Sequence, residues 1–427
     1  MTLPNHSSML LPFMLSDTHD CILNPYSPPM TPFREALDLL LKHTPVLATE
    51  CCRIEQAGGR VLREEIRTDR AFPPFDRVMM DGYALRVVDW QTGHRTFRVT
   101  GIAPAGQPVV DLPDEPASCV EVMTGAPLPA GANCIVPVEE VSRTGTEQII
   151  VADSFEAAVG RFIHHVGSDA PAGVILLSPG IMLGSRQIGV AASCGAGLLQ
   201  VSCLPRITVI ATGDELVAVD ELPAAHQIRQ SNAHAIECAL RRAGYPVRHV
   251  GMLGDDARPA APVLLDSLAD CEWLVLTGAV SRGAHDFLPA MLDAMGCTRL
   301  FHGVAQRPGK PAGCWLGPSG QVILALPGNP VSALTGLHAM MLPALAVACG
   351  LPVPKPRWVI AERGIAGLSG MTHHLPVSLR DDGRAQAAAT GNSGDFIGLL
   401  RSDGWITIPP ADGKPAIQAA FPFSPWL

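Results

Sequence analysis

The sequence VLTGAVSRGAHDF, residues 275–287, begins as an apolar run and then places Gly278, Ser281, Arg282 and Asp286 in one short loop. Such an apolar run is typical of a strand that is buried on both faces, whereas the loop carries groups that a core would not hold. Strand-like and helix-like segments alternate around it: RITVIAT, SNAHAIECALRRAG, VRHVGML, ARPAAPVLLDSLAD and CEWLVLTG. The alternation predicts a doubly wound, mostly parallel α/β sheet domain over residues 204–350.

Four loops follow predicted strands of this sheet, and each combines glycine or proline with a polar or ionic residue. They are ATGDELV (211–217), TGAVSRGAHDF (277–287), AQRPGKP (305–311) and LPGNPVS (326–332). Ligands of open parallel sheets bind at the carboxyl ends of the strands, so we expect these loops to form one site. Gly278 and Gly283 let the backbone approach an anion, and Arg307 and Lys310 lie in a proline-stiffened turn that suits a fixed anion.

Carboxylates are predicted at the same edge of the sheet, in the pairs Asp214–Glu215 and Asp255–Asp256 and at Asp286. Their oxygens suit Mg²⁺, which commonly bridges carboxylates to substrate phosphates. Alternatively, Asp214 and Asp255 cap the helices that follow them.

Two other motifs suggest competing chemistry. Residues 279–283, AVSRG, are similar to the GxSxG nucleophile elbow of serine hydrolases, with alanine at the first position. None of the downstream histidines has a characteristic context: His302, His338, His373 and His374. We interpret the histidine pairs 164–165 and 373–374 as surface or turn residues, because they lack further spaced metal ligands.

The rest of the chain predicts four further parts. Residues 32–66 place apolar side chains at helical spacing and, with residues 155–203, predict a helical linker domain. Short valine-rich runs between proline and glycine turns predict an inserted β domain over residues 67–154. Residues 351–427 predict a small, barrel-like C-terminal β domain, and residues 1–31 a loose N-terminal extension.

Amino-acid composition indicates which kinds of partner the protein binds and in which cellular compartment it works. The net charge of −9 argues against a nucleic-acid partner, because phosphate backbones are bound chiefly by lysine and arginine surfaces. Twelve scattered cysteines without a CxxC pair indicate reduced thiols and, with no secretory signal, predict a cytoplasmic location. Residues 321–354 carry no charge, but their prolines favour a buried strand, a loop and a buried helix over a membrane span.

Seven segments, taken in order, resemble the molybdopterin molybdenumtransferases, the MoeA and gephyrin E-domain family. They are FPPFDRVMMDGYALR (72–86), EVMTGAPLPAGANCIVPVEE (121–140), ATGDEL, SNAHAI, TGAVSRGAHDF, RPGKP and LPGNPVSAL, within a likeness that covers residues 32–427. The resemblance implies an elongated homodimer that takes adenylylated molybdopterin and molybdate and releases molybdenum cofactor and AMP with the help of Mg²⁺. It also implies contact with other pathway proteins or molybdoenzyme acceptors.

The resemblance places the site between the α/β domain of one subunit and the β domain of the other. It implies five catalytic residues: Asp81, Thr124, Glu215, Asp286 and Lys310. The implied substrate-binding residues are Gly278, Ser281, Arg307, Gly309, Pro327, Gly328, Asn329 and Ser332. The implied metal ligands are Glu215, Asp256 and Asp286.

The sequence departs from the family pattern at several of these motifs. Arg77, Val78 and Met79 replace the usual Asn-Ser-Ala and put bulky groups beside a substrate-facing motif. Further departures are Ala279 and His285 in the TGAVSRGAHDF loop, Arg307 in RPGKP, and His164, His165 and Ser168 between Ile163 and Asp169. These changes predict a divergent member, and they leave open a non-catalytic, pterin-binding carrier or scaffold.

Overall fold

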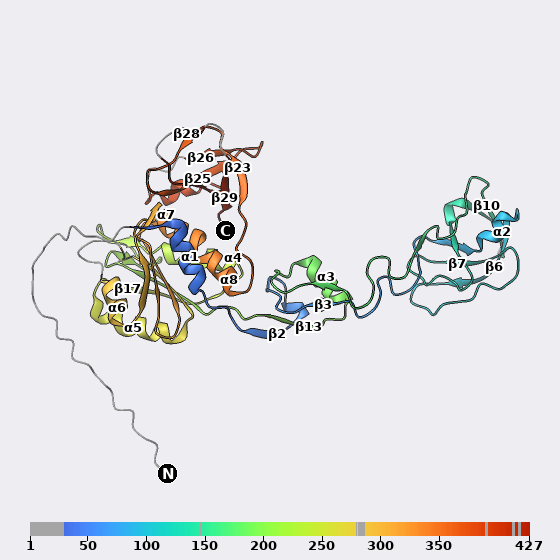
Figure 1. Ribbon diagram of the computed structural model, residues 1–427, viewed down its shortest axis with the longest axis horizontal. Coiled ribbons are helices and arrows are strands. Elements are labelled where there is room, and N and C mark those ends of the chain that lie inside the picture. The colour runs from blue at the N-terminus through green and yellow to red at the C-terminus, as the bar shows by residue number, and fades with distance from the viewer. Residues whose placement is uncertain are drawn as a thin grey trace, which may run out of the picture.

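The computed structural model describes residues 30–145, 147–278, 280, 287–388, 392–411, 415–416 and 420–427. Figure 1 shows an elongated molecule with the α/β domain and the C-terminal β domain side by side at one end. A thin linker domain leads from them to the inserted β domain at the other end. The inserted β domain and the α/β domain are therefore far apart within one subunit.

The α/β domain is built on a six-stranded sheet in which four neighbouring strands are parallel and the last two, toward one edge, are joined by antiparallel pairing. The order is β17 (Val247–Leu253), β14 (Ile207–Thr212), β18 (Trp273–Thr277), β22 (Val322–Leu326), β21 (Gly313–Leu316) and β19 (Thr298–His302). The chain runs from the central β14 to β17 on one side and then to β18 on the other. The strand order therefore reverses between β14 and β18, where open α/β sheets bind ligands.

Helices cover both faces of this sheet because the strand residues alternate between two cores. Val209 and Val275 belong to one core cluster, whereas Ile210 and Leu274 belong to the other. The first cluster is covered by α1 (Phe33–His43), α4 (Asn232–Arg242), α7 (Pro330–Gly336), a π-helical turn (Leu337–Met341) and α8 (Leu342–Ala348). The second is covered by α5 (Ala257–Asp270) and α6 (Leu288–Ala294). The sheet is thus doubly wound.

The helical segment from Pro330 to Ala348 is long and apolar enough to cross a membrane by length and composition alone. Within the fold, however, 78% of that segment is buried. Leu337, Met340 and Met341 are fully buried in the α/β core. The segment therefore serves as a core helix, as the sequence predicts.

The prediction of helix over residues 32–66 is wrong for most of that range. Only α1 is helical, and it packs on the α/β core through Ala36 and Leu40. The chain then forms β2 (Thr49–Arg53), a 3₁₀ turn (Ile54–Gln56) and β3 (Ile66–Arg67). Gly59, with a φ of +79°, lies in the turn between the 3₁₀ segment and β3, where a helix could not continue.

The linker domain is mostly paired strands and not helical. β2 pairs with β13 (Leu198–Ser202), and β3 pairs with β12 (Ile175–Leu177). One helix, α3 (Ser185–Ser193), packs beside them on a small core that includes Leu62, Leu183 and Leu199. Both connections to the β domain leave from this unit.

The inserted β domain has a six-stranded sheet, with its own two core clusters. The order is β8 (Cys134–Pro137), β5 (Gly82–Leu85), β7 (Ser118–Val122), β6 (Thr96–Ala103), β10 (Gln148–Val151) and β9 (Val141–Thr144), with α2 (Val87–Gln91) and a 3₁₀ turn (Val138–Glu140) beside them. A Cβ at Gly82 would lie 2.0 Å from the carbonyl oxygen of Val136, so only glycine fits where β5 meets β8. A short pair, β4 (Arg77–Val78) with β11 (Ile163–His164), forms beside the connections to the linker.

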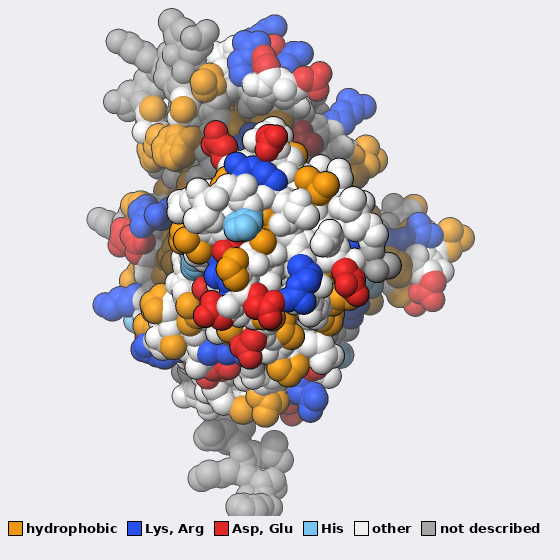
Figure 2. All heavy atoms as spheres, turned by 90° about the vertical axis from the view of Figure 1, so that its right-hand side faces the viewer, with side chains coloured by type: hydrophobic (Ala, Val, Ile, Leu, Met, Phe, Trp, Pro, Cys, Tyr) orange, Lys and Arg blue, Asp and Glu red, His pale blue; other side chains and the backbone are white. Residues whose placement is uncertain are grey.

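The outer end of the β domain carries both signs of charge. Figure 2 looks along the long axis onto this end and shows acidic and basic side chains interspersed with apolar ones. Ion pairs of the β domain include Arg98–Glu115, Arg143–Glu121 and Arg95–Asp153. This face therefore presents no large patch of one sign.

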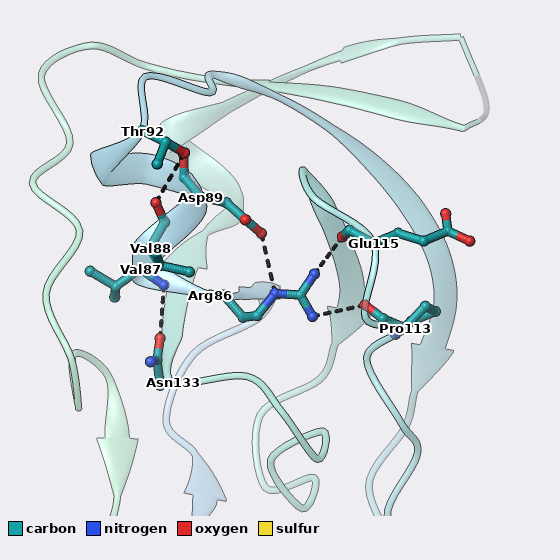
Figure 3. Close-up of polar contacts among 8 residues, drawn as sticks. All are labelled: Arg86, Val87, Val88, Asp89, Thr92, Pro113, Glu115 and Asn133. Carbon is teal, nitrogen blue, oxygen red and sulfur yellow. Dashed lines mark hydrogen bonds and ion pairs between the residues drawn. The ribbon is translucent and has the colours of Figure 1, made fainter.

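Arg86 joins three parts of the β domain (Figure 3). Its Nε donates to Asp89 Oδ2 at 3.3 Å, and its other two nitrogens donate to the carbonyl oxygens of Pro113, at 2.8 Å, and Glu115. The side chains of Arg86 and Asp89 are only 15% and 9% exposed. Beside them, Val87 N donates to Asn133 Oδ1 at 2.8 Å and holds the start of α2.

Replacing Arg86 with methionine is expected to destabilise the β domain by about 3 kcal/mol, because the Asp89 carboxylate then stays buried without its cation. Hydrogen exchange of the β-domain amides measures the loss. Arg98→Met is the control, since the Arg98–Glu115 pair is exposed and is expected to contribute less than about 1 kcal/mol. Equal losses in the two variants would show that Arg86 is not a structural clamp.

The C-terminal domain is a seven-stranded sheet that also takes in two strands from earlier in the chain. The order is β1 (Thr31–Pro32), β20 (Val304–Arg307), β25 (Thr372–Leu379), β27 (Gly404–Ile408), β29 (Ala420–Pro425) and β23 (Arg357–Ile360), with β26 (Ala385–Ala387) also on β25. A bridge between Ala361, directly after β23, and Ala385 of β26 joins these two strands, so that β25, β27, β29, β23 and β26 form a closed ring. A further pair, β24 (Ile365–Ala366) with β28 (Pro415–Ala416), and α9 (Phe396–Leu399) complete the domain.

The expectation that the AQRPGKP loop follows a strand of the α/β sheet is therefore wrong. Its first three residues belong to β20, which pairs in parallel with β1 and β25 of the C-terminal sheet, and the rest of the loop is the turn after this strand. One face of β20 still packs on the α/β core through Val304. The loop thus lies at the boundary between the two domains.

Candidate functional site

A pocket of about 570 Å³ lies where the strand order of the α/β sheet reverses. Its walls include the ends of β14, β18 and β22, the start of α4, and a short strand pair, β15 (Leu216–Val217) with β16 (Ile228–Arg229). We call this the strand-end pocket. It contains these predicted site residues: Glu215, Gly278, Pro327, Gly328 and Asn329.

Hydrogen bonds fix three of the loops that form the strand-end pocket. Asn232 Nδ2 donates to Thr277 Oγ1 at 3.1 Å and to the carbonyl oxygen of Gly328 at 2.7 Å. Thr277 Oγ1 donates to the carbonyl oxygen of Pro327 at 3.2 Å. Asn232 is a positioning residue that our sequence reasoning missed, although its motif, SNAHAI, was among the recognised segments.

Gly278 and Gly328 play different parts in this pocket. Gly278 has a φ of +107°, and a Cβ there would lie 2.2 Å from the carbonyl oxygen of Thr212. At Gly328 the nearest atom to an added Cβ is Gly278 Cα at 3.8 Å, an ordinary contact. Gly278 is therefore required by the backbone, whereas Gly328 leaves space in the pocket.

Gly278→Ala is expected to destabilise the protein by at least about 2 kcal/mol, because the methyl group meets backbone at a disfavoured φ. Gly328→Ala is expected to keep the wild-type melting temperature and to weaken substrate binding by filling the pocket. Thermal unfolding and steady-state kinetics on both variants check these results. A Gly278→Ala protein with wild-type stability would contradict the assignment.

The carboxylates at the strand-end pocket have different surroundings. Glu215 and Asp255 line it, and Asp214 Oδ1 accepts a hydrogen bond from Asp255 N at 2.9 Å. Asp256 caps α5 by accepting from Arg258 N at 2.9 Å, so capping falls to Asp256 and not to Asp255. Among the described residues no three His, Cys, Asp or Glu side chains form a metal-binding group.

Asp286 and Ser281, with the departures Ala279 and His285, lie outside the described residues. The catalytic and metal roles of Asp286 and the substrate-binding role of Ser281 therefore stay predictions. The oxygens of Glu215 and Asp255 are of the hard type that Mg²⁺ prefers, so the described part of the pocket fits such an ion.

A second pocket, of about 560 Å³, lies between the α/β domain and the C-terminal domain. We call it the interdomain pocket. It takes in the RPGKP loop, the start of α7, the start of β25 and residues 392–393. Its predicted site residues are Arg307, Gly309, Lys310, Pro327, Asn329 and Ser332. It shares Pro311, Pro327 and Asn329 with the strand-end pocket.

The interdomain pocket is electropositive. Arg307 and Lys310 are exposed to it, and neither forms an ion pair with another described residue. No aspartate or glutamate is among the described residues that line it. In a protein with a net charge of −9, this arrangement favours a bound anion.

Local hydrogen bonds shape the turn that presents these two cations. Gly309 has a φ of +95°, and its carbonyl oxygen accepts from Gln306 Nε2 at 3.1 Å and from Ala312 N at 3.1 Å. Val304 N donates to the carbonyl oxygen of Lys310 at 2.8 Å. The turn is thus held by backbone and glutamine contacts, which leaves the charged ends of Arg307 and Lys310 available.

The interpretation of His373 and His374 as surface or turn residues is wrong. Both line the interdomain pocket from β25, and His374 is only 1% exposed. The sequence could not show this, because a histidine pair at the start of a β-like run is compatible with either face of a strand.

Asp81 and Thr124 form a contact of their own in the β domain. Asp81 Oδ1 accepts from Thr124 N at 2.7 Å and from Thr124 Oγ1 at 2.8 Å. These bonds lower the pKa of the Asp81 carboxyl and keep it charged. The β domain lies at the far end of the molecule from both pockets (Figure 1), so one subunit does not bring these residues to Lys310.

The side chains of Arg77, Val78 and Met79, which depart from the family pattern before MDGYA, have different surroundings. Val78 is 1% exposed and belongs to the β-domain core, so it does not face a substrate. Met79 is 52% exposed, and exposed Arg77 donates to His164 Nδ1 at 3.0 Å. His164 Nε2 in turn lies 2.8 Å from Asp169 Oδ1, so the departures Arg77 and His164 contact each other.

Known proteins match this chain over most of its length. Residues 31–195 match the MoeA N-terminal region (domains I and II), and residues 208–347 match a probable molybdopterin-binding domain. The chain is 33% identical over 396 residues to a molybdopterin molybdenumtransferase of Synechocystis sp., covering 92% of this chain and 98% of that protein. It is also 33% identical over 387 residues to one from Synechococcus elongatus, covering 88% and 95%.

A solved structure shares the fold. The MoeA protein of Pyrococcus horikoshii OT3, described as a molybdopterin biosynthesis protein, superposes with a TM-score of 0.77 at 26% identity. The match covers 92% of this chain and 99% of that one. These findings confirm the resemblance seen in the sequence motifs. The chain belongs to the MoeA family of molybdopterin molybdenumtransferases.

Proposed function

We propose that this protein is a molybdenum insertase that cleaves adenylylated molybdopterin and inserts molybdate to give molybdenum cofactor and AMP. One observation carries the proposal beyond family membership: two pockets of different charge adjoin and share Pro311, Pro327 and Asn329. One holds carboxylates and backbone loops at a strand-order reversal, and the other holds two cations. A nucleotide-linked pterin and an oxyanion can therefore be bound side by side.

The residues divide between these two tasks. In the strand-end pocket, the backbone at Gly278 and Gly328 approaches the adenylylated pterin closely, and Asn232 keeps the loops in place. In the interdomain pocket, Arg307 and Lys310 neutralise molybdate, with Ser332 and Asn329 as hydrogen-bonding groups. Glu215, with Asp256 and Asp286, would hold Mg²⁺, which neutralises charge that gathers on the phosphates as the anhydride breaks.

We further propose that the protein works as a homodimer with a composite site. Asp81 and Thr124 lie too far from the pockets of their own subunit (Figure 1), so a second copy must supply them. The charged Asp81, held by Thr124, would then orient the substrate from the side opposite Lys310.

Several chemical features suit the proposed setting. The described cysteines are all free thiols, which favours the reducing cytoplasm. The proposed substrates are small molecules. The proposed protein partners are other molybdenum cofactor proteins or molybdoenzyme acceptors, and we expect neither a nucleic acid nor a membrane as a partner. The relatives are named as transferases, which favours the enzyme over a non-catalytic pterin carrier.

Release of AMP tests the proposal. Purified protein is incubated with adenylylated molybdopterin, Mg²⁺ and molybdate, and AMP and molybdenum cofactor are measured together. We expect molybdate-dependent formation of both products. Tight pterin binding without AMP release would instead support the carrier.

A further inference from the structure

The interdomain pocket contains two buried histidine nitrogens that none of the contacts described so far uses. His373 lies opposite Arg307 in the parallel register of β25 and β20, and His374 follows it. His373 Nδ1 and His374 Nε2 are buried and make no hydrogen bond to a described residue. Buried nitrogens without a partner are costly, so their presence in a pocket indicates a bound ligand.

His374 is the fixed member of the pair. Its Nδ1 lies 3.2 Å from the Thr407 hydroxyl, and its ring meets the Phe33 ring edge-on with centroids 4.6 Å apart. Complete burial, and secondarily the neighbouring His373, lower the pKa of His374 to about 3. His374 therefore stays neutral at physiological pH.

His373 is the responsive member, because it is only partly buried and faces the cations of the pocket. The charged or titratable groups around it are Arg307 on β20, Lys310 in the turn after β20, and His374 on its own strand. The start of α7 and residues 392–393 contribute only neutral groups to the described lining, such as Ser332 and Asn392. Burial, and then Arg307, lower the pKa of His373, so the free pocket holds this ring neutral near pH 7.

A tetrahedral dianion in the pocket would reverse this balance. Its two negative charges offset Arg307 and Lys310 and favour the protonated ring. We propose that His373 is an anion-binding residue of the interdomain pocket and takes up one proton from solvent when the dianion binds. Three positive groups then surround the anion, and no bond of the anion is made or broken.

The inference rests on the proposed function, because it takes molybdate as the dianion. Linkage fixes its sign: binding that takes up a proton becomes tighter as pH falls through the pKa of the bound form. The gain levels off below the pKa of the free form. Each unit by which the anion raises the pKa of His373 strengthens binding about tenfold at the acidic end.

Isothermal titration calorimetry on the full chain with sodium molybdate tests the inference. Titrations near pH 6.5 and near pH 8, each in two buffers of different ionisation enthalpy, give the Kd and the protons taken up per anion. We expect uptake approaching one proton near the acidic end and about tenfold tighter binding there than near pH 8.

Two variants separate the charge of His373 from its shape. His373→Asn is expected to abolish uptake and to bind about tenfold more weakly near pH 6.5, with little dependence on pH. His373→Lys carries a permanent charge and is expected to lose uptake while binding well at both pH values. His94→Asn, at an exposed position in the β domain, is the control and should behave as the wild type.

The outcomes distinguish the two proposals. A wild type that binds molybdate without proton uptake, or a folded His373→Asn protein that keeps the uptake, overturns the role of His373 and leaves the proposed function intact. A wild type that does not bind molybdate at all removes the oxyanion pocket and this inference with it.

Discussion

Mixing subunits that carry Asp81→Ala with subunits that carry Lys310→Ala is expected to restore about a quarter of the wild-type activity, although each variant alone is nearly inactive. The reason is the distance between the β domain and the pockets within one subunit (Figure 1). If each site takes Asp81 from one subunit and Lys310 from the other, a heterodimer has one intact site and one doubly altered site. Random exchange makes about half of the dimers heterodimers, which gives the expected fraction.

The experiment denatures and refolds the two variants together, or co-expresses them with different tags, and measures AMP release. A mixture of Asp81→Ala with Thr124→Ala is the matched control. Both residues come from the β domain and contact each other, so no combination of these subunits yields an intact site. Full inactivity of the Asp81→Ala and Lys310→Ala mixture, with dimers shown to form, would place the site within one subunit.

Lys310→Ala alone is expected to lower turnover about 100-fold or more and to leave the melting temperature within about 2 °C of the wild type. Lys310 is exposed and forms no ion pair with a described residue, so it contributes little to folding. It does supply half of the fixed positive charge that lines the interdomain pocket. Loss of a charge from an anion site weakens substrate binding and the stabilisation of charge during reaction.

Kinetics at several molybdate concentrations and thermal unfolding check this prediction. Lys355→Ala is the control, since Lys355 is also exposed but lies in the connection after α8 and away from both pockets. A large fall in the melting temperature of Lys310→Ala would show that the lysine is part of the fold and not of the site.

The sequence predicted the α/β sheet well because its central strands, β14, β18 and β22, are buried on both faces. Such strands appear as continuous apolar runs, and WLVL at residues 273–276 is one example. Strands of this kind are followed by loops at one edge, so Glu215, Gly278 and Asn329 could be expected together before the structure was known. The predicted division into linker, inserted β, α/β and C-terminal domains rests in the same way on changes of the residue pattern along the chain.

Sheet membership could not be predicted for short strands. β20 is four residues long, and nothing in VAQR shows that it pairs with β1 and β25 and not with β19. The pairing depends on contacts between segments far apart in the chain, which local patterns do not encode. For the same reason the sequence did not reveal that the RPGKP turn faces His373.

Residues 49–66 show a second limit. Their apolar positions fit a helix as well as they fit short strands, so spacing alone could not separate the two. Val78 shows a third limit, since a residue beside a site motif can point into the core. In both cases tertiary packing, and not the local pattern, decides the secondary structure of the segment or the burial of the side chain.

The position of β20 has a consequence for evolution and engineering. Because residues 31–32 and 304–307 pair within the C-terminal sheet, a cut at residue 351 would strip β20 of its neighbour β25 and uncover an edge of unpaired amides. A chimaera that exchanges the C-terminal part between relatives would therefore have to carry both short segments with it. The C-terminal domain is therefore harder to exchange between relatives than its position at the end of the chain suggests.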